Sequence, residues 1–109
     1  MNRNLAAAIL LGAMIPCLSV VAFADDALTI VQNGRAFHPN EITIDHGQSL
    51  NFSNQDEFIH QIYVDVPNFN YDSAEQPPGQ TLTIHFPDAG TFPVRCHIHP
   101  KMLLTVHVR

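Results

Sequence analysis

Short alternating segments, separated by turn residues, fill the chain from residue 28 onward and limit the fold it can adopt. Apolar and polar side chains alternate within each segment, which is the pattern of a half-buried β-strand. No apolar repeat of helical period extends beyond one turn. The sequence therefore predicts an all-β domain of the sandwich or barrel type. The expected strands are Leu28–Gln32, Ile42–Asp45, Ser49–Ser53, Phe58–Val66, Thr81–Phe86, Thr91–Cys96 and Met102–Val108.

Turn signals separate these strands at Asn33-Gly34, His46-Gly47, Pro77-Pro78-Gly79 and Asp88-Ala89-Gly90. Residues 67–80 have no clear period, and a loop, a short helix or an irregular edge strand all remain open for them. Pro93 lies inside an expected strand, which indicates an edge position or a bulge.

The N-terminal segment is a predicted signal peptide. Arg3 precedes a run without charged side chains, Leu5–Ala24, which ends in the small-residue pattern Ala22-Phe23-Ala24. We expect cleavage after Ala24, a mature domain at 25–109, and export to the periplasm. Twenty uncharged residues are also long enough to cross a bilayer, so a retained anchor is the alternative. After cleavage no stable membrane insertion is expected.

Cysteine usage in the predicted mature part is unusual for an exported protein. Of the two cysteines, Cys17 lies in the predicted signal peptide and Cys96 alone remains, so an internal disulfide is excluded. Such a thiol is either buried and inert or held by a ligand. All seven histidines also follow residue 25, and together with Cys96 they indicate a metal site.

Strand parity predicts which side chains face the core, because side chains alternate between the two faces of a strand. His60 shares the parity of the apolar residues of its strand, Phe58, Ile62, Val64 and Val66. Cys96 continues the inward set Phe92 and Val94, and Met102 begins the inward set of the last strand. Three expected strands thus direct a histidine, a cysteine and a methionine inward. His85 and His107 have outward parity, and they are expected on the surface together with His38 and His46.

The run Cys96-His97-Ile98-His99-Pro100-Lys101-Met102 carries the chemistry. A tight loop between two strands can bring its thiol, imidazole and thioether around one ion, with His60 as a fourth ligand. Two imidazoles, a thiolate and a weak thioether suit a trigonal copper site for electron transfer, whereas zinc sites favour four strong ligands or three and a water. Each residue also has a structural interpretation: Cys96 as a packed thiol, Met102 as a core side chain, and His60 as a hydrogen-bonded core histidine.

These residues resemble the cupredoxin family of small blue-copper proteins over roughly Leu28 to Arg109. The Cys-x-x-His-x-x-Met spacing is similar to that of amicyanins, and Pro78-Gly79-Gln80-Thr81 and Ala89-Gly90-Thr91-Phe92 look like plastocyanin sequence. The resemblance implies a Greek-key β-sandwich with one type 1 copper ion at one end. It implies His60, Cys96 and His99 as strong ligands, Met102 as the axial ligand, and His99 as the solvent-edge ligand.

Three positions depart from the family pattern. Gln61 stands where an Asn usually ties the two ligand loops together, which puts that hydrogen bond in question. Lys101 places a charge where amicyanins have an apolar residue, on the surface expected to dock partners. His97 is a further imidazole next to the thiolate, and it could face solvent or compete for the metal.

The resulting hypothesis is an exported electron carrier that cycles one copper between Cu(I) and Cu(II) and exchanges electrons with redox partner proteins. We expect a monomer. We also expect no enzymatic activity, because the sequence indicates no open coordination position and no substrate pocket. The alternative is a periplasmic protein that buffers or delivers copper. A formal net charge of −5 argues against a nucleic-acid partner, which would require a basic face, and none is expected.

Overall fold

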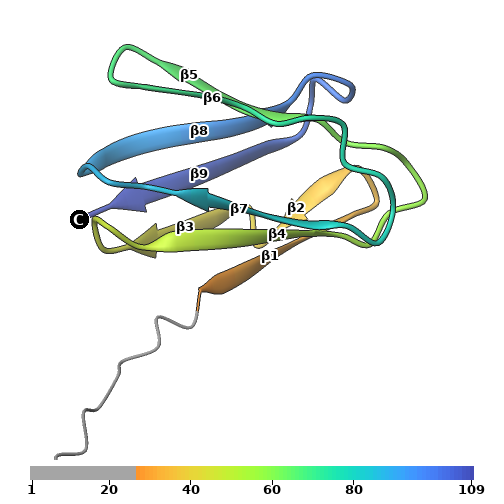
Figure 1. Ribbon diagram of the computed structural model, residues 1–109, viewed down its shortest axis with the longest axis horizontal. Helices are drawn as coiled ribbons and strands as arrows, with labels where there is room; N and C mark the ends of the chain where they lie inside the picture. Colours follow the sequence, from red (N-terminus) through yellow and green to blue (C-terminus); the bar gives the residue numbers. More distant parts are fainter. Residues whose placement is uncertain (1–26) are drawn as a thin grey trace, which may run out of the picture.

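The computed structural model describes residues 27–109, which form nine β-strands in two facing sheets (Figure 1). Alternating side chains let each sheet bury one face against the other. The strands are β1 (Leu28–Asn33), β2 (Ala36–His38), β3 (Glu41–Ile44), β4 (Ser49–Asn54), β5 (Ile62–Val66), β6 (Phe69–Asp72), β7 (Thr81–His85), β8 (Gly90–Cys96) and β9 (Leu103–Val108).

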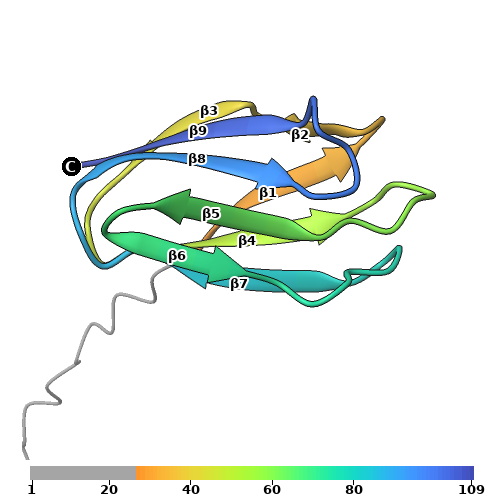
Figure 2. The same ribbon diagram turned by 90° about the horizontal axis from the view of Figure 1, so that it is seen from above.

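The two sheets have the orders β2-β1-β4-β7 and β3-β9-β8-β5-β6 (Figure 2). Strands β1 and β4 pair in parallel, as do β3 and β9, and the other pairings are antiparallel. The chain therefore crosses repeatedly between the layers. The predicted all-β class and Greek-key β-sandwich are confirmed.

Six of the seven expected strands are present with ends shifted by at most one residue. The prediction for Phe58–Val66 was wrong in its first half, because β5 begins only at Ile62. Residues 58–61 belong to a loop, so strand parity does not apply there, and Phe58 is exposed rather than inward. Two short strands, β2 and β6, were not predicted as such. Of the three possibilities left open for residues 67–80, the structure shows an edge strand, β6.

Pro93 lies in β8, an interior strand of its sheet. On one side Pro93 pairs with Thr105 of β9. On the other side, β5 pairs with β8 only at Cys96 and Arg95, so no ladder with β5 extends to the proline. A missing N–H is tolerated there, because the position is locally equivalent to an edge.

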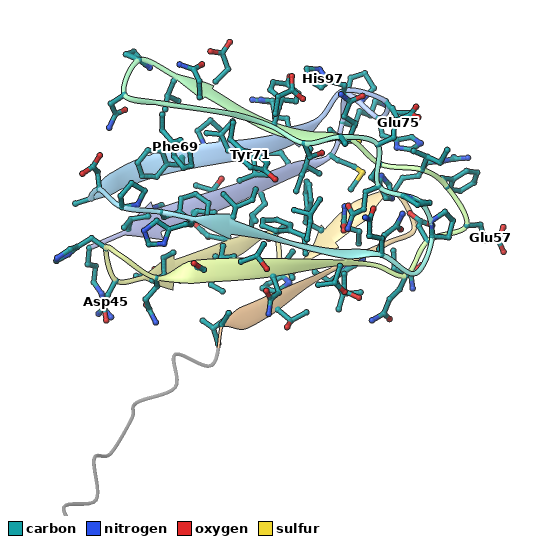
Figure 3. All side chains as sticks on the ribbon, in the orientation of Figure 1. Asp45, Glu57, Phe69, Tyr71, Glu75 and His97 are labelled. Atoms are coloured by element: carbon teal, nitrogen blue, oxygen red, sulfur yellow. The ribbon has the colours of Figure 1, made fainter. Side chains whose placement is uncertain are left out.

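Sixteen buried apolar side chains fill the space between the sheets. At one end, Phe69, Phe86 and Phe92 form a cluster with ring centroids 5.4–5.8 Å apart. Phe86 and Phe92 are fully buried, and burial of each such ring contributes about 1.5–3 kcal/mol, so this cluster stabilises that end of the sandwich. Figure 3 shows Phe69 at the end opposite to His97 and Glu57.

The other end of the sandwich holds the loops that carry the predicted ligands. The β1–β2 turn, the β4–β5 loop, the β6–β7 loop and the β8–β9 loop meet there (Figures 1 and 2). Residues 27–109 include no helix that is long and apolar enough to cross a membrane. The predicted signal peptide at 1–24 lies outside the described residues and stays a prediction.

Candidate metal centre

Three side chains from two loops and one strand end converge at this end of the sandwich. Cys96 is the last residue of β8, and His99 follows in the β8–β9 loop, where the Met102 N–H donates to the His99 carbonyl (2.9 Å) and tightens the turn. His60 is held from the opposite side by paired backbone hydrogen bonds with Gln76 (2.7 and 3.1 Å). The fold thus joins residues more than 35 positions apart in the sequence.

The three potential ligand atoms form a compact triangle. Nδ1 of His60 lies 3.2 Å from Nδ1 of His99, and the Cys96 Sγ lies 3.6 and 3.9 Å from these two nitrogens. A circle through three atoms with these separations has a radius of about 2.1 Å. Metal–imidazole bonds measure about 2.0–2.1 Å and metal–thiolate bonds about 2.3 Å, as zinc sites show. One metal ion therefore fits between the three atoms at bonding distance from each.

Burial differs sharply within this triangle. His60 and Cys96 are buried, whereas His99 is partly exposed and its ring contacts the edge of the exposed Phe58 ring at 5.9 Å between centroids. Burial lowers the pKa of His99, and the nearby His60 and Arg35 lower it further. A neutral imidazole with a free nitrogen is the form that binds a metal.

The backbone of Gln61 ties the two ligand loops together. Its N–H points at the Cys96 Sγ (3.4 Å), and its carbonyl accepts from the His97 N–H (2.9 Å). The Gln61 side chain instead donates to the Ser73 carbonyl (3.2 Å). In the family pattern, an Asn side chain at this position connects the two ligand loops. Here the main chain of Gln61 connects them, so the loops stay joined although the residue is Gln.

Met102 is buried at 2% exposure, as its parity predicts. The same burial fits a core side chain and an axial ligand beside the triangle. Its role as a ligand stays a prediction.

His97 lies at the surface (Figure 3), with 42% of its side chain exposed. Its ring stacks on Tyr63 at 3.8 Å, and its Nε2 lies 3.1 Å from the Asp72 carboxylate. Within residues 27–109 the potential metal-binding group consists of His60, Cys96 and His99. The solvent-facing alternative for His97 is thus the one the structure shows. His38, His46, His85 and His107 lie at the surface, as expected.

A buried polar network behind His60 was not predicted. It consists of Gln32, Asn54, Asp56 and Gln76, all at most 8% exposed. A sequence signal existed for two of them: Gln32 follows the inward parity of Ile30, and Asn54 follows that of Leu50 and Phe52. Polar residues at inward positions indicate a hydrogen-bonded site rather than a plain core.

Asp56 is the charged member of this network and the contact partner of His60. Its Oδ2 lies 3.1 Å from the His60 Nε2, the ring nitrogen that faces away from the triangle. Burial by itself raises the pKa of Asp56, but the amide hydrogen bonds from Arg35, Gly34 and Glu57 and the bond with His60 outweigh it and hold the pKa below its usual value. Asp56 is therefore an ionised carboxylate next to the metal-binding group.

The comparisons with known proteins agree with this architecture. The chain is similar to a reduced variant of amicyanin (TM-score 0.73, 20% identity, covering 81% of this chain and 87% of that one). It is also similar to a purple cupredoxin from Nitrosopumilus maritimus (TM-score 0.68, 21% identity, 75% and 99% covered). A copper-containing nitrite reductase from Thermus scotoductus matches with a TM-score of 0.68 and 24% identity over 76% of this chain, but over only 22% of the reductase.

No curated protein matches the chain. A family model described as a cupredoxin-like domain matches residues 5–106. Because that match covers almost the entire sequence, the chain belongs to the cupredoxin-like family.

Proposed function

We propose that this protein is an exported carrier of single electrons that uses one type 1 copper ion. The observation that carries the proposal is the triangle of His60 Nδ1, His99 Nδ1 and Cys96 Sγ, whose size fits one ion at bonding distance. The strong ligands are His60, Cys96 and His99, and Met102 is the axial ligand. Bound there, copper supplies the exchange of one electron between its cuprous and cupric states.

The ligand set favours copper over other metals. A thiolate and a thioether stabilise the soft cuprous ion, whereas imidazoles accept both oxidation states. The backbone ties at Gln61 and Gln76 fix His60 and Cys96 on the two sides of the site. A site that is already held in one arrangement changes little when an electron arrives or leaves, which makes the exchange fast.

His99 is the member of the triangle that is open to solvent, so electrons pass through its exposed edge. A surface cavity of about 420 Å³ adjoins it, lined by Arg35, Ile98, His99, Pro100 and Lys101. Two of these residues are cationic and none is acidic, although the chain as a whole carries a formal charge of −5. A redox partner that presents carboxylates around an apolar centre fits this surface.

The carrier is exported to the periplasm through the predicted signal peptide at 1–24, and it acts as a monomer without enzymatic activity of its own. Cys96 forms no disulfide within residues 27–109, although disulfides are common in exported proteins. Binding to copper would protect its thiolate from the oxidising surroundings. A single metal-binding group within residues 27–109 supports one copper per chain.

Repeated redox cycling of the copper-loaded protein tests this function against copper delivery. The protein is reduced, offered a Cu(I) chelator of moderate affinity, and reoxidised over many cycles. A carrier retains its copper and reacts with one electron per chain in each cycle. Loss of Cu(I) to the chelator after the first reduction would contradict the carrier function and support delivery.

A further inference from the structure

A buried carboxylate stands directly behind His60. The Asp56 side chain is 5% exposed and that of His60 is fully buried. Their contact of 3.1 Å joins Oδ2 to Nε2, on the side of the ring opposite to Nδ1. An imidazole that donates its Nε2–H to a carboxylate leaves the Nδ1 lone pair free toward the triangle.

The β1–β2 turn holds this carboxylate in place. Gly34 and Arg35 both have positive φ (63° and 56°), an uncommon conformation for a residue such as arginine. This turn directs the Arg35 N–H onto Asp56 Oδ2 at 2.7 Å. The same oxygen thus accepts from the Arg35 amide and faces His60, which fixes its position relative to the ring.

The side chain of Asn54 holds the β4–β5 loop in place through three hydrogen bonds. Its Oδ1 accepts the Asp56 N–H (2.9 Å), and its amide group donates to the Phe58 and Gln76 carbonyls (both 2.9 Å). Gln76 in turn pairs with the His60 backbone. Carboxylate and histidine are therefore fastened to one scaffold, and their contact does not depend on a flexible surface chain.

We propose that Asp56 is a positioning residue that fixes the Nε2–H form of His60 and, through its buried negative charge, makes the site favour Cu(II) over Cu(I). This inference rests on the copper function proposed above. A charge in a buried environment acts strongly at short range, because little solvent lies between it and the ion to screen it. The doubly charged cupric ion gains more from that charge than the singly charged cuprous ion does.

The substitution Asp56→Asn tests the charge while keeping the shape. The side-chain carbonyl oxygen of the introduced asparagine can still accept from Arg35 and His60, the two partners of Oδ2. Its amide group replaces Oδ1 and loses the longer bond from the Glu57 N–H (3.3 Å). Mutation of the hydrogen-bond partner of a metal-binding histidine typically lowers metal affinity by about 10–100-fold. We expect the ratio of Cu(II) to Cu(I) affinity to fall about tenfold, which corresponds to a rise in reduction potential of about 59 mV for one electron.

Glu57→Gln is the matched control, because it removes the same charge one residue away. The Glu57 side chain is exposed and projects outward at the tip of this end (Figure 3). Solvent and salt screen its charge, so the potential of this variant should stay close to that of the original protein. Equal shifts in the two variants, or no shift in Asp56→Asn, would overturn the proposal while leaving the copper site itself intact.

A measurement on the unaltered protein covers the case in which Asp56→Asn fails to fold. In the copper-free protein at neutral pH, where no metal occupies Nδ1, nitrogen NMR reports which ring nitrogen of His60 carries the proton. We expect a slowly exchanging proton on Nε2. A proton on Nδ1 would overturn the proposal, whereas failure of the protein to bind copper at all would instead overturn the proposed function.

Discussion

Replacement of Asn54 by alanine is expected to destabilise the fold through the loop that precedes His60. The change removes two buried hydrogen bonds, to the Asp56 N–H and the Gln76 carbonyl, and one partly buried bond, to the Phe58 carbonyl. The Gln76 carbonyl keeps its bond from the His60 N–H, so two groups lose their partner. An unsatisfied buried group such as the Asp56 N–H costs about 1–3 kcal/mol and the partly buried Phe58 carbonyl costs less, which together gives a loss of about 3 kcal/mol.

Thermal and denaturant unfolding of the copper-free protein measure this loss. For a domain of this size, about 1 kcal/mol shifts the Tm by roughly 4–8 °C, so a fall of more than about 10 °C is expected for Asn54→Ala. Asn51→Ala is the matched control in the same strand, because it removes a single exposed hydrogen bond, from the Thr83 hydroxyl. Its effect should stay within about 0.5 kcal/mol. Similar losses in both variants would refute the role assigned to the buried network.

Three further substitutions test the site and its surface. Cys96→Ser should abolish any intense visible absorption of the copper-loaded protein, and a retained spectrum would exclude Cys96 as a ligand. Met102→Leu preserves volume and should cost less than about 1.5 kcal/mol, but it should change the reduction potential, because the axial ligand tunes it. An unchanged potential would make Met102 a core residue only. Lys101→Glu should slow oxidation by anionic hexacyanoferrate severalfold at low salt, and much less at high salt. Equal rates for both forms would contradict a docking role for this charge.

The strands of the sandwich were predictable because alternation and turn residues are local signals. Asn33-Gly34 marked the β1–β2 turn, and the parity of Phe92 and Val94 placed Cys96 inward, as observed. Strand β2 was missed because three residues are too few to show a period. Phe58 was misplaced because its segment continues a strand pattern in the sequence but runs as a loop in the structure.

The metal-binding group was predictable in part because Cys96 and His99 are close in sequence. His60 was placed inward by parity across a segment that proved to be a loop, so the correct outcome came from the backbone bridge to Gln76 rather than from a continuous strand. Asp56 could not be predicted, because its contact depends on how the Gly34–Arg35 turn packs against the β4–β5 loop. Such contacts between loops have no periodic signature in the sequence.

We propose that His60, Cys96 and His99 hold one copper ion through a thiolate and two imidazoles. Visible absorption and electron paramagnetic resonance of the Cu(II)-loaded protein test it most directly. We expect an intense thiolate-to-copper band together with a small copper hyperfine splitting, at one copper per chain. A pale cupric spectrum with a normal hyperfine splitting, or no retention of Cu(II), would contradict it.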